Sequence, residues 1–326
     1  MRGRLLVNSN ETGEKPVTIY AAMAANLGIA LAKLAAAFLT RSSAMLSEGI
    51  HSLADTGNQG LMLLGNHLSK KPADRSHPFG YGMEIYFWSL IVALILFGLG
   101  GGLSAYEGIT HLQNPPQLED PTWNYVVLGV AALLEGTSFT IALRKLMVHR
   151  NAGENVIQAV HTSKNPEIFL VLFEDSAALV GILIAFLAVL LGHLFDNPYL
   201  DGVGSLLIGV VLGIVAIFLA YETRLLLLGE GAEQPMVVAI CRMIKDDRDV
   251  LGVARPMTMY FGPHHVLLNI AIHFKEDVST KDLVRIVDRL ESQVRKAYPI
   301  IRQIYIEAES FKIGNPEQEE LEDCAE

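Results

Sequence analysis

Long hydrophobic stretches fill the first two thirds of the chain. Six of them, over residues 17–40, 44–68, 84–112, 123–147, 167–194 and 202–226, approach or exceed the length of about 20 residues that a helix needs to cross a bilayer. The second is the least hydrophobic, because polar side chains recur along one face of the helix that it predicts. A hydropathy window alone would pass over it, so the count of six depends on the charges of the connectors.

Those charges alternate along the chain. Lys and Arg occur before the first stretch, in the second and fourth connectors and after the sixth, whereas residues 113–122 and 195–201 contain neither. Because positive charges favour the cytoplasmic side, this pattern predicts six membrane helices with both termini in the cytoplasm. We expect an integral, multi-pass protein of a bacterial inner membrane, preceded by a cytoplasmic tail over residues 1–16.

From about residue 229, the composition becomes that of a small soluble domain. Helical periodicity covers 235–246, two strands are expected over 257–262 and 266–274, a helix begins near 277–280, and a last strand covers 301–310. The order helix–strand–strand–helix–strand predicts a cytoplasmic α+β domain of ferredoxin-like or metallochaperone-like form. We expect a six-helix membrane domain over 17–228, this α+β domain over 229–313, and an acidic disordered tail over 314–326.

Composition agrees with a membrane protein and excludes several other classes. The 326 residues are 51% hydrophobic, and the mean hydropathy is +0.34, which would be unusual for a soluble enzyme. A net charge of −10 argues against a nucleic-acid partner. The two cysteines, Cys241 and Cys324, form no CxxC motif, so a thiolate zinc site is not expected.

Ionisable residues inside the hydrophobic stretches are the main functional signal. His51 and Asp55 lie four residues apart, so they stack on one face of the second predicted helix, with Glu48 on the same stripe. The fifth stretch carries Glu174 and Asp175. Such groups are costly at membrane depth and by default mark an ion or proton path. Since imidazole and carboxylate bind divalent transition metals, we expect a metal site formed by His51, Asp55 and Asp175.

The other intramembrane acids leave alternatives open. Glu174 lies about 100° around the helix from Asp175, so it is a fourth ligand, a proton carrier or a partner of Glu48. Glu135 is either a proton relay or an interhelical hydrogen-bonding partner while protonated. We expect His51 and Asp55 to couple proton movement to metal binding, because imidazole ordinarily titrates near neutral pH.

Two further sets of side chains are weaker candidates for metal binding. Asp74 and His77 lie in a polar loop after the second stretch, where they are either a two-ligand peripheral site or ordinary loop residues. Glu307 and Glu309 point the same way on the last predicted strand, which suits a shared regulatory ion, although exposed strand carboxylates are common. Histidines that could join them are His264, His265 and His273.

The chain resembles the cation diffusion facilitators, a zinc-transporter family, from about residue 17 to 310. The motifs that carry the resemblance are HSLADTGNQ in the second stretch, HPFGYG before the third and FEDSAALVG in the fifth. The chain is most similar to the branch that includes the mitochondrial zinc transporter of animals. The resemblance implies a homodimer in a lipid bilayer that exchanges a cytoplasmic divalent cation, usually Zn²⁺, for protons, with no prosthetic group and no catalytic residues.

By the same resemblance, His51 and Asp55 take the place of the family's ligand pair in the second span, and Asp175 that of a ligand in the fifth. The family usually has histidine four residues before that aspartate, where this chain has Val171; Glu174 is a possible substitute. A site with one imidazole among carboxylates offers harder ligands than one with two imidazoles. It therefore favours Mn²⁺, Fe²⁺ or Co²⁺ more than a typical zinc site does.

Outside the spans, Asp74 and His77 match two loop ligands of some members, with Tyr81 replacing a third. Glu307 and Glu309 fall where some members bind regulatory zinc. Two rival functions remain: an intramembrane metalloenzyme, which lacks an HExxH-type motif here, and a non-transporting membrane metal sensor.

Overall fold

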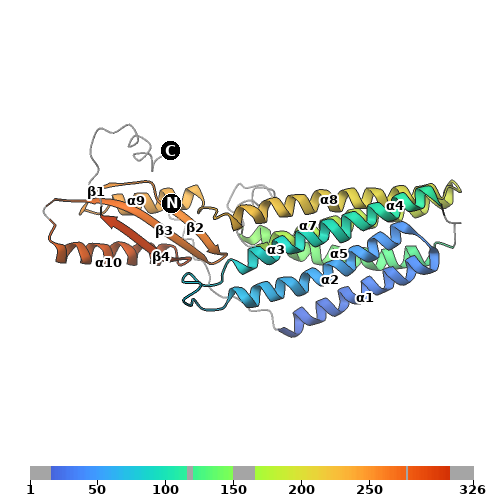
Figure 1. The fold of residues 1–326 in the computed structure, drawn as a ribbon, viewed down its shortest axis with the longest axis horizontal. Coiled ribbons are helices and arrows are strands. Elements are labelled where there is room, and N and C mark those ends of the chain that lie inside the picture. Colours follow the sequence, from blue (N-terminus) through green and yellow to red (C-terminus); the bar gives the residue numbers. More distant parts are fainter. Residues whose placement is uncertain (1–15, 116–119, 150–165, 277, 309–326) are drawn as a thin grey trace. The chain divides into compact units, whose positions relative to one another are not determined.

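The computed structural model describes residues 16–115, 120–149, 166–276 and 278–308 (Figure 1). Its first part is helical, and the segments in chain order are α1 (Pro16–Thr40), α2 (Ser43–Ser69), α3 (Glu84–Ile95), the π-helical segment η1 (Leu96–Gly102), α4 (Leu103–Gln113), α5 (Thr122–His149), α7 (Pro166–Leu194) and α8 (Tyr199–Leu227). The second part contains α9 (Gln234–Lys245), β1 (Val250–Val253), β2 (Met257–Gly262), β3 (His265–Phe274), α10 (Thr280–Ala297) and β4 (Ile301–Ala308).

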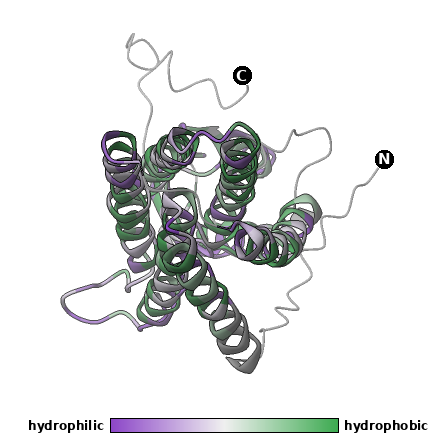
Figure 2. Ribbon diagram, turned by 90° about the vertical axis from the view of Figure 1, so that its right-hand side faces the viewer, coloured by the Kyte–Doolittle hydropathy of each residue, from purple (hydrophilic) through white to green (hydrophobic). Residues whose placement is uncertain are grey.

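Hydrophobicity identifies the chain as a multi-pass membrane protein. Within the described residues, four helical stretches are long and apolar enough to cross a bilayer: Glu84–Gln113, Thr122–Met147, Ile168–Leu194 and Tyr199–Leu227. Figure 2 shows that hydrophobic residues are spread along the helices of this part. The expected first and second spans also coincide with helices. In α1, however, only Asn26–Thr40 forms an apolar helix, which is shorter than a full span, and α2 is not among the stretches apolar enough to cross a bilayer. The six-span count therefore stays a prediction.

The residues divide into two compact units, which are described separately. The first unit comprises 1–59, 98–135 and 177–213, and the second comprises 60–97, 136–176 and 214–326. In the first unit, glycines let α4 and α8 approach closely. A Cβ added to Gly108 would lie 2.8 Å from the carbonyl oxygen of Gly202, and one added to Gly209 would lie 2.9 Å from the backbone nitrogen of Ala105. Small residues at such positions allow backbones to pack directly.

A buried aspartate fastens the turn between α1 and α2 to the start of α8 in this first unit. Asp201 accepts hydrogen bonds from the Ser42 hydroxyl (2.5 Å) and the Ser43 hydroxyl (2.9 Å), and also from the Ser43 backbone N–H. The Ser47 and Ser205 hydroxyls meet at 2.5 Å. These polar contacts hold the start of α2 against the start of α8 within the first unit.

The second unit contains a four-stranded sheet with β3 at its centre. Residues 265–269 of β3 pair antiparallel with β2, residues 272–274 pair antiparallel with β1, and β4 runs parallel to residues 266–272. The strands and helices of this domain confirm the predicted α+β class. The short strand β1 was missed, because its four residues include a register shift beside Gly252 and show no clear alternation.

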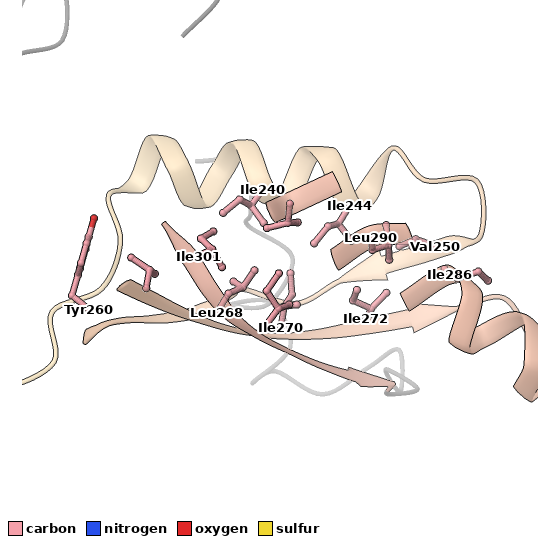
Figure 3. Close-up of a cluster of buried hydrophobic side chains, with 13 residues drawn as sticks. Ile240, Ile244, Val250, Tyr260, Leu268, Ile270, Ile272, Ile286, Leu290 and Ile301 are labelled. Atoms are coloured by element: carbon pink, nitrogen blue, oxygen red, sulfur yellow. The ribbon is translucent and has the colours of Figure 1, made fainter. Parts of the chain in front are cut away.

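Alternating side chains of β3 build the core of this domain. Val266, Leu268, Ile270 and Ile272 are buried, while the residues between them are half-buried. Figure 3 shows Leu268, Ile270 and Ile272 on the same side of the sheet as Ile240 and Ile244 of α9 and Leu290 of α10, with which they form one hydrophobic cluster. The helix α10 begins where it was expected, with the Ser279 hydroxyl accepting a hydrogen bond from the backbone N–H of Asp282.

The loop between α2 and α3 contacts the turn between β2 and β3, also within the second unit. The rings of Phe79 and Phe261 stack with their centroids 4.8 Å apart. Gly82 lies against the same turn, and a Cβ added there would overlap the carbonyl oxygen of Phe261. A glycine is therefore needed at residue 82 for this contact.

Truncation of the core should loosen the domain locally. We expect Leu290→Ala to reduce the stability of the sheet domain by about 2–5 kcal/mol, because Leu290 is fully buried and its loss leaves a cavity. Amide hydrogen exchange of the full chain should accelerate in α9, α10 and β3. The control is Val284→Ala on the same helix, where 58% of the side chain is exposed; equal acceleration in both variants would contradict the assignment of the core.

Candidate functional site

The histidine and aspartate of the polar stripe lie together on α2. His51 is fully buried, and its Nε2 lies 3.5 Å from Oδ2 of Asp55. Among the described residues, neither ring nitrogen of His51 has a hydrogen-bond partner. Buried polar atoms are normally satisfied, so the imidazole keeps a nitrogen available to a ligand.

A buried lysine next to this pair escaped the sequence analysis. Lys33 of α1 is fully buried and donates hydrogen bonds to Oε2 of Glu48 (3.0 Å) and to the Ser52 hydroxyl (2.7 Å). Both partners lie on α2, on either side of His51 in the sequence. A lysine inside a hydrophobic stretch is as unusual as an acid there. A search of the hydrophobic stretches for basic as well as acidic residues would have identified Lys33.

The second oxygen of the Glu48 carboxylate packs against α7. A Cβ added to Gly181 would overlap Oε1 of Glu48, so this carboxylate lies between α1 and α7. Glu135 of α5, which is half-buried, is close enough to interact electrostatically with both Lys33 and Glu48. Three ionisable groups from three helices therefore share one region of the first unit.

The acids predicted on the fifth hydrophobic stretch lie on α7 in the second unit. Glu174 and Asp175 are both buried, whereas Val171, in the expected position of a histidine, is 36% exposed. In the described parts of the chain, neither unit by itself gathers three His, Cys, Asp or Glu side chains that could hold a metal ion. His51 and Asp55 belong to the first unit, so their convergence with Asp175 stays a prediction.

Asp74 and His77 organise the loop between α2 and α3. The Asp74 carboxylate accepts hydrogen bonds from the Ser76 hydroxyl (2.7 Å), the Tyr81 hydroxyl (2.8 Å) and the backbone N–H groups of Ser76 and His77. These donors, the Ser76 hydroxyl first, hold the pKa of Asp74 below its ordinary value. His77 Nδ1 lies 3.7 Å from Asp74 Oδ1. A metal at this site would have to displace bonds that shape the loop.

The acidic pair of the last strand is only partly described. Glu307 is exposed on β4 and its Oε1 accepts a hydrogen bond of 3.3 Å from Nδ2 of Asn269. Glu309 lies outside the described residues. His265, at the opposite end of the β3–β4 pairing, is half-buried, and burial lowers the pKa of its imidazole. A regulatory metal site at Glu307 and Glu309 stays a prediction.

The sequence profile of a cation efflux transmembrane domain matches residues 19–228. The chain belongs to the cation efflux family. This confirms the resemblance that the HSLAD and HPFGYG motifs carried. Membership of a family of membrane cation transporters also favours a transporter over the metalloenzyme alternative.

Several relatives of this cation efflux protein have described functions. The chain is 34% identical over 250 residues to the mouse protein "Proton-coupled zinc antiporter SLC30A9, mitochondrial", covering 76% of this chain and 44% of the relative; the human protein gives the same figures. It is 28% identical over 314 residues to metal tolerance protein C4 of Arabidopsis thaliana, covering 82% of this chain and 67% of that protein. The chain thus spans less than half the length of the animal antiporters.

Gly181 offers a test of the close packing around Glu48. We expect Gly181→Ala to lower the free energy of unfolding by about 1–3 kcal/mol, because the added methyl group overlaps the Glu48 carboxylate. Thermal unfolding of the detergent-solubilised chain measures it. The matched control is Gly129→Ala on α5, where an added Cβ meets no heavy atom within 4 Å; similar melting temperatures for both variants would contradict the packing.

His265 should titrate below the ordinary histidine value of 6.5. Because its pKa is lowered on folding, the unfolded chain binds more protons as the pH falls below 6.5, so His265 makes the sheet domain less stable at acidic pH. NMR titration of ¹³C-labelled histidine in the full chain, assigned with His265→Gln, measures the midpoint. A midpoint at or above that of His265 in the urea-unfolded chain would show that burial does not lower the pKa of this imidazole.

Proposed function

We propose that this cation efflux protein is a secondary active antiporter that exports a divalent transition-metal cation in exchange for protons. The proposed substrate ligands are His51, Asp55 and Asp175, with Glu174 as a fourth. Family membership and the printed function of the SLC30A9 relatives, proton-coupled zinc antiport, support the proposal.

The observation that carries the proposal is the state of His51. In the part of the chain that the structure describes, neither nitrogen of this fully buried imidazole has a hydrogen bond, and a buried unsatisfied polar group typically destabilises by about 1–3 kcal/mol. Asp55, one helical turn away, supplies an oxygen within 3.5 Å of the ring. A role as a ligand to the substrate cation therefore explains this buried imidazole better than a role in packing.

Competition between metal and protons for the same atoms would couple their movements. A metal binds the neutral imidazole and the ionised carboxylates, so binding releases protons from these groups. Protonation of the same side chains on the opposite side of the membrane then favours release of the metal. Alternation between two conformations, each favoured by a different ligand, completes the exchange. Glu135, within electrostatic reach of Lys33 and Glu48, is a candidate proton carrier along this path.

The identity of the metal is a separate part of the proposal. Zn²⁺ is the substrate named for the SLC30A9 relatives. Val171 stands where a second imidazole is expected, and its side chain, which is 36% exposed, has no ligating atom. The proposed ligands are therefore mostly carboxylate oxygens. Carboxylate ligands suit Mn²⁺ and Fe²⁺ as well, which makes an exporter of Mn²⁺, Fe²⁺ or Co²⁺ the second candidate.

The assembly and its location complete the proposal. We propose a homodimer formed through the sheet domain, with both chain termini in the cytoplasm, as the placement of Lys and Arg indicates. The sequence favours a bacterial inner membrane, whereas the SLC30A9 relatives are named as mitochondrial. The bacterial assignment stays a prediction.

Reconstituted vesicles test the proposed site. We expect Asp55→Asn to reduce metal-driven proton flux more than about 100-fold, beyond the effect usually seen when an outer-shell partner of a metal is lost. Flux is measured with a pH-sensitive dye under an imposed pH gradient, across Zn²⁺, Mn²⁺, Fe²⁺ and Co²⁺.

The control is Asp196→Asn, which changes an exposed carboxylate in a left-handed backbone position that asparagine tolerates (φ 50°). Asp196→Asn should keep the flux of the unmodified chain. Normal flux in Asp55→Asn would refute the site. Absence of flux with every metal in the unmodified chain would refute antiport and favour a membrane metal sensor.

A further inference from the structure

We propose that Lys33 is a built-in cation that keeps Glu48 from binding the transported metal and thereby limits metal affinity. The inference rests on the proposed function, because it assumes that the metal binds at His51 and Asp55. It assigns an affinity-limiting role to a residue outside the proposed ligand set.

The position of Lys33 relative to the proposed ligands is the first argument. Its ammonium contacts Glu48 and Ser52, which stand three residues before and one residue after His51. Residues three or four apart on a helix are neighbours on its surface. A positive charge is therefore fixed on the same turn of α2 that presents the imidazole.

The state of the Glu48 carboxylate is the second argument. Oε2 is occupied by the Lys33 ammonium at 3.0 Å, whereas Oε1 has no hydrogen-bond partner among the described residues. Both side chains are fully buried, so each charge depends on the other for compensation. A carboxylate on this stripe would be a natural ligand for a divalent cation, and the ammonium occupies the place that such a cation would take.

The third argument concerns the requirement for release. A transported ion must bind strongly enough to enter and weakly enough to leave. An additional carboxylate ligand would raise affinity for a hard divalent cation and slow its departure. With Lys33 tied to Glu48, the metal meets fewer carboxylates and a nearby positive charge, and both effects weaken binding.

Charge-removing substitutions test this role in the full-length protein. We expect Lys33→Met to tighten the Kd for Zn²⁺ roughly tenfold, equivalent to about 1.4 kcal/mol, and to slow uptake at saturating Zn²⁺ in vesicles. X-ray absorption of bound Zn²⁺ should show an additional oxygen ligand. The double variant Lys33→Met/Glu48→Gln should return the Kd to within about threefold of the unmodified value. Lys70→Met, in the exposed loop after α2, is the control and should change neither quantity.

A second comparison keeps the test decisive if Lys33→Met leaves Glu48 uncompensated and does not fold. Glu48→Gln retains the lysine charge without its partner, and adding Lys33→Met to it removes only that charge. We expect the double variant to bind Zn²⁺ roughly tenfold more tightly than Glu48→Gln. Equal affinities in this pair, or an unchanged or weaker affinity in a folded Lys33→Met, would overturn the inference. Failure of the proposed function is distinguishable, because Asp55→Asn would then leave Zn²⁺ binding unchanged.

Discussion

The fixed positive charge of Lys33 inside the helices is the constraint on which the arrangement of the first unit depends. An ammonium that is fully shielded from solvent must be compensated by an acid at hydrogen-bonding distance, and Glu48 provides one at 3.0 Å. The pair connects α1 to α2, and the contact of Glu48 with Gly181 extends the connection to α7. The orientation of the α2 stripe, and with it that of His51, follows from this electrostatic requirement.

A second set of polar contacts holds the start of α2. The carboxylate of Asp201 receives the Ser42 and Ser43 hydroxyls, and glycines bring α4 and α8 into backbone contact. In an apolar environment, polar contacts and close packing replace the hydrophobic driving force that holds soluble helices together. The two sets of polar contacts thus fix the N-terminal part of α2, which also carries the imidazole.

Local patterns predicted the elements of the fold well, whereas contacts between distant residues were much harder to predict. The hydrophobic stretches from residue 84 onwards match helices of the membrane part, and the capping residue Ser279 marks the start of α10. β1 was missed because four residues with a register shift carry no periodic signal. The stripe of His51 and Asp55 follows from helical spacing alone. The Lys33–Glu48 pair could not be derived in that way, because its partners are fifteen residues apart on different helices.

The contact at Gly82 has a mechanical consequence. The backbone of residue 82 lies directly against the β2–β3 turn, and the stacked rings of Phe79 and Phe261 sit beside it. There is no side chain between the two backbones that could deform and absorb a displacement. A shift of this turn would therefore press directly on the residues that precede α3.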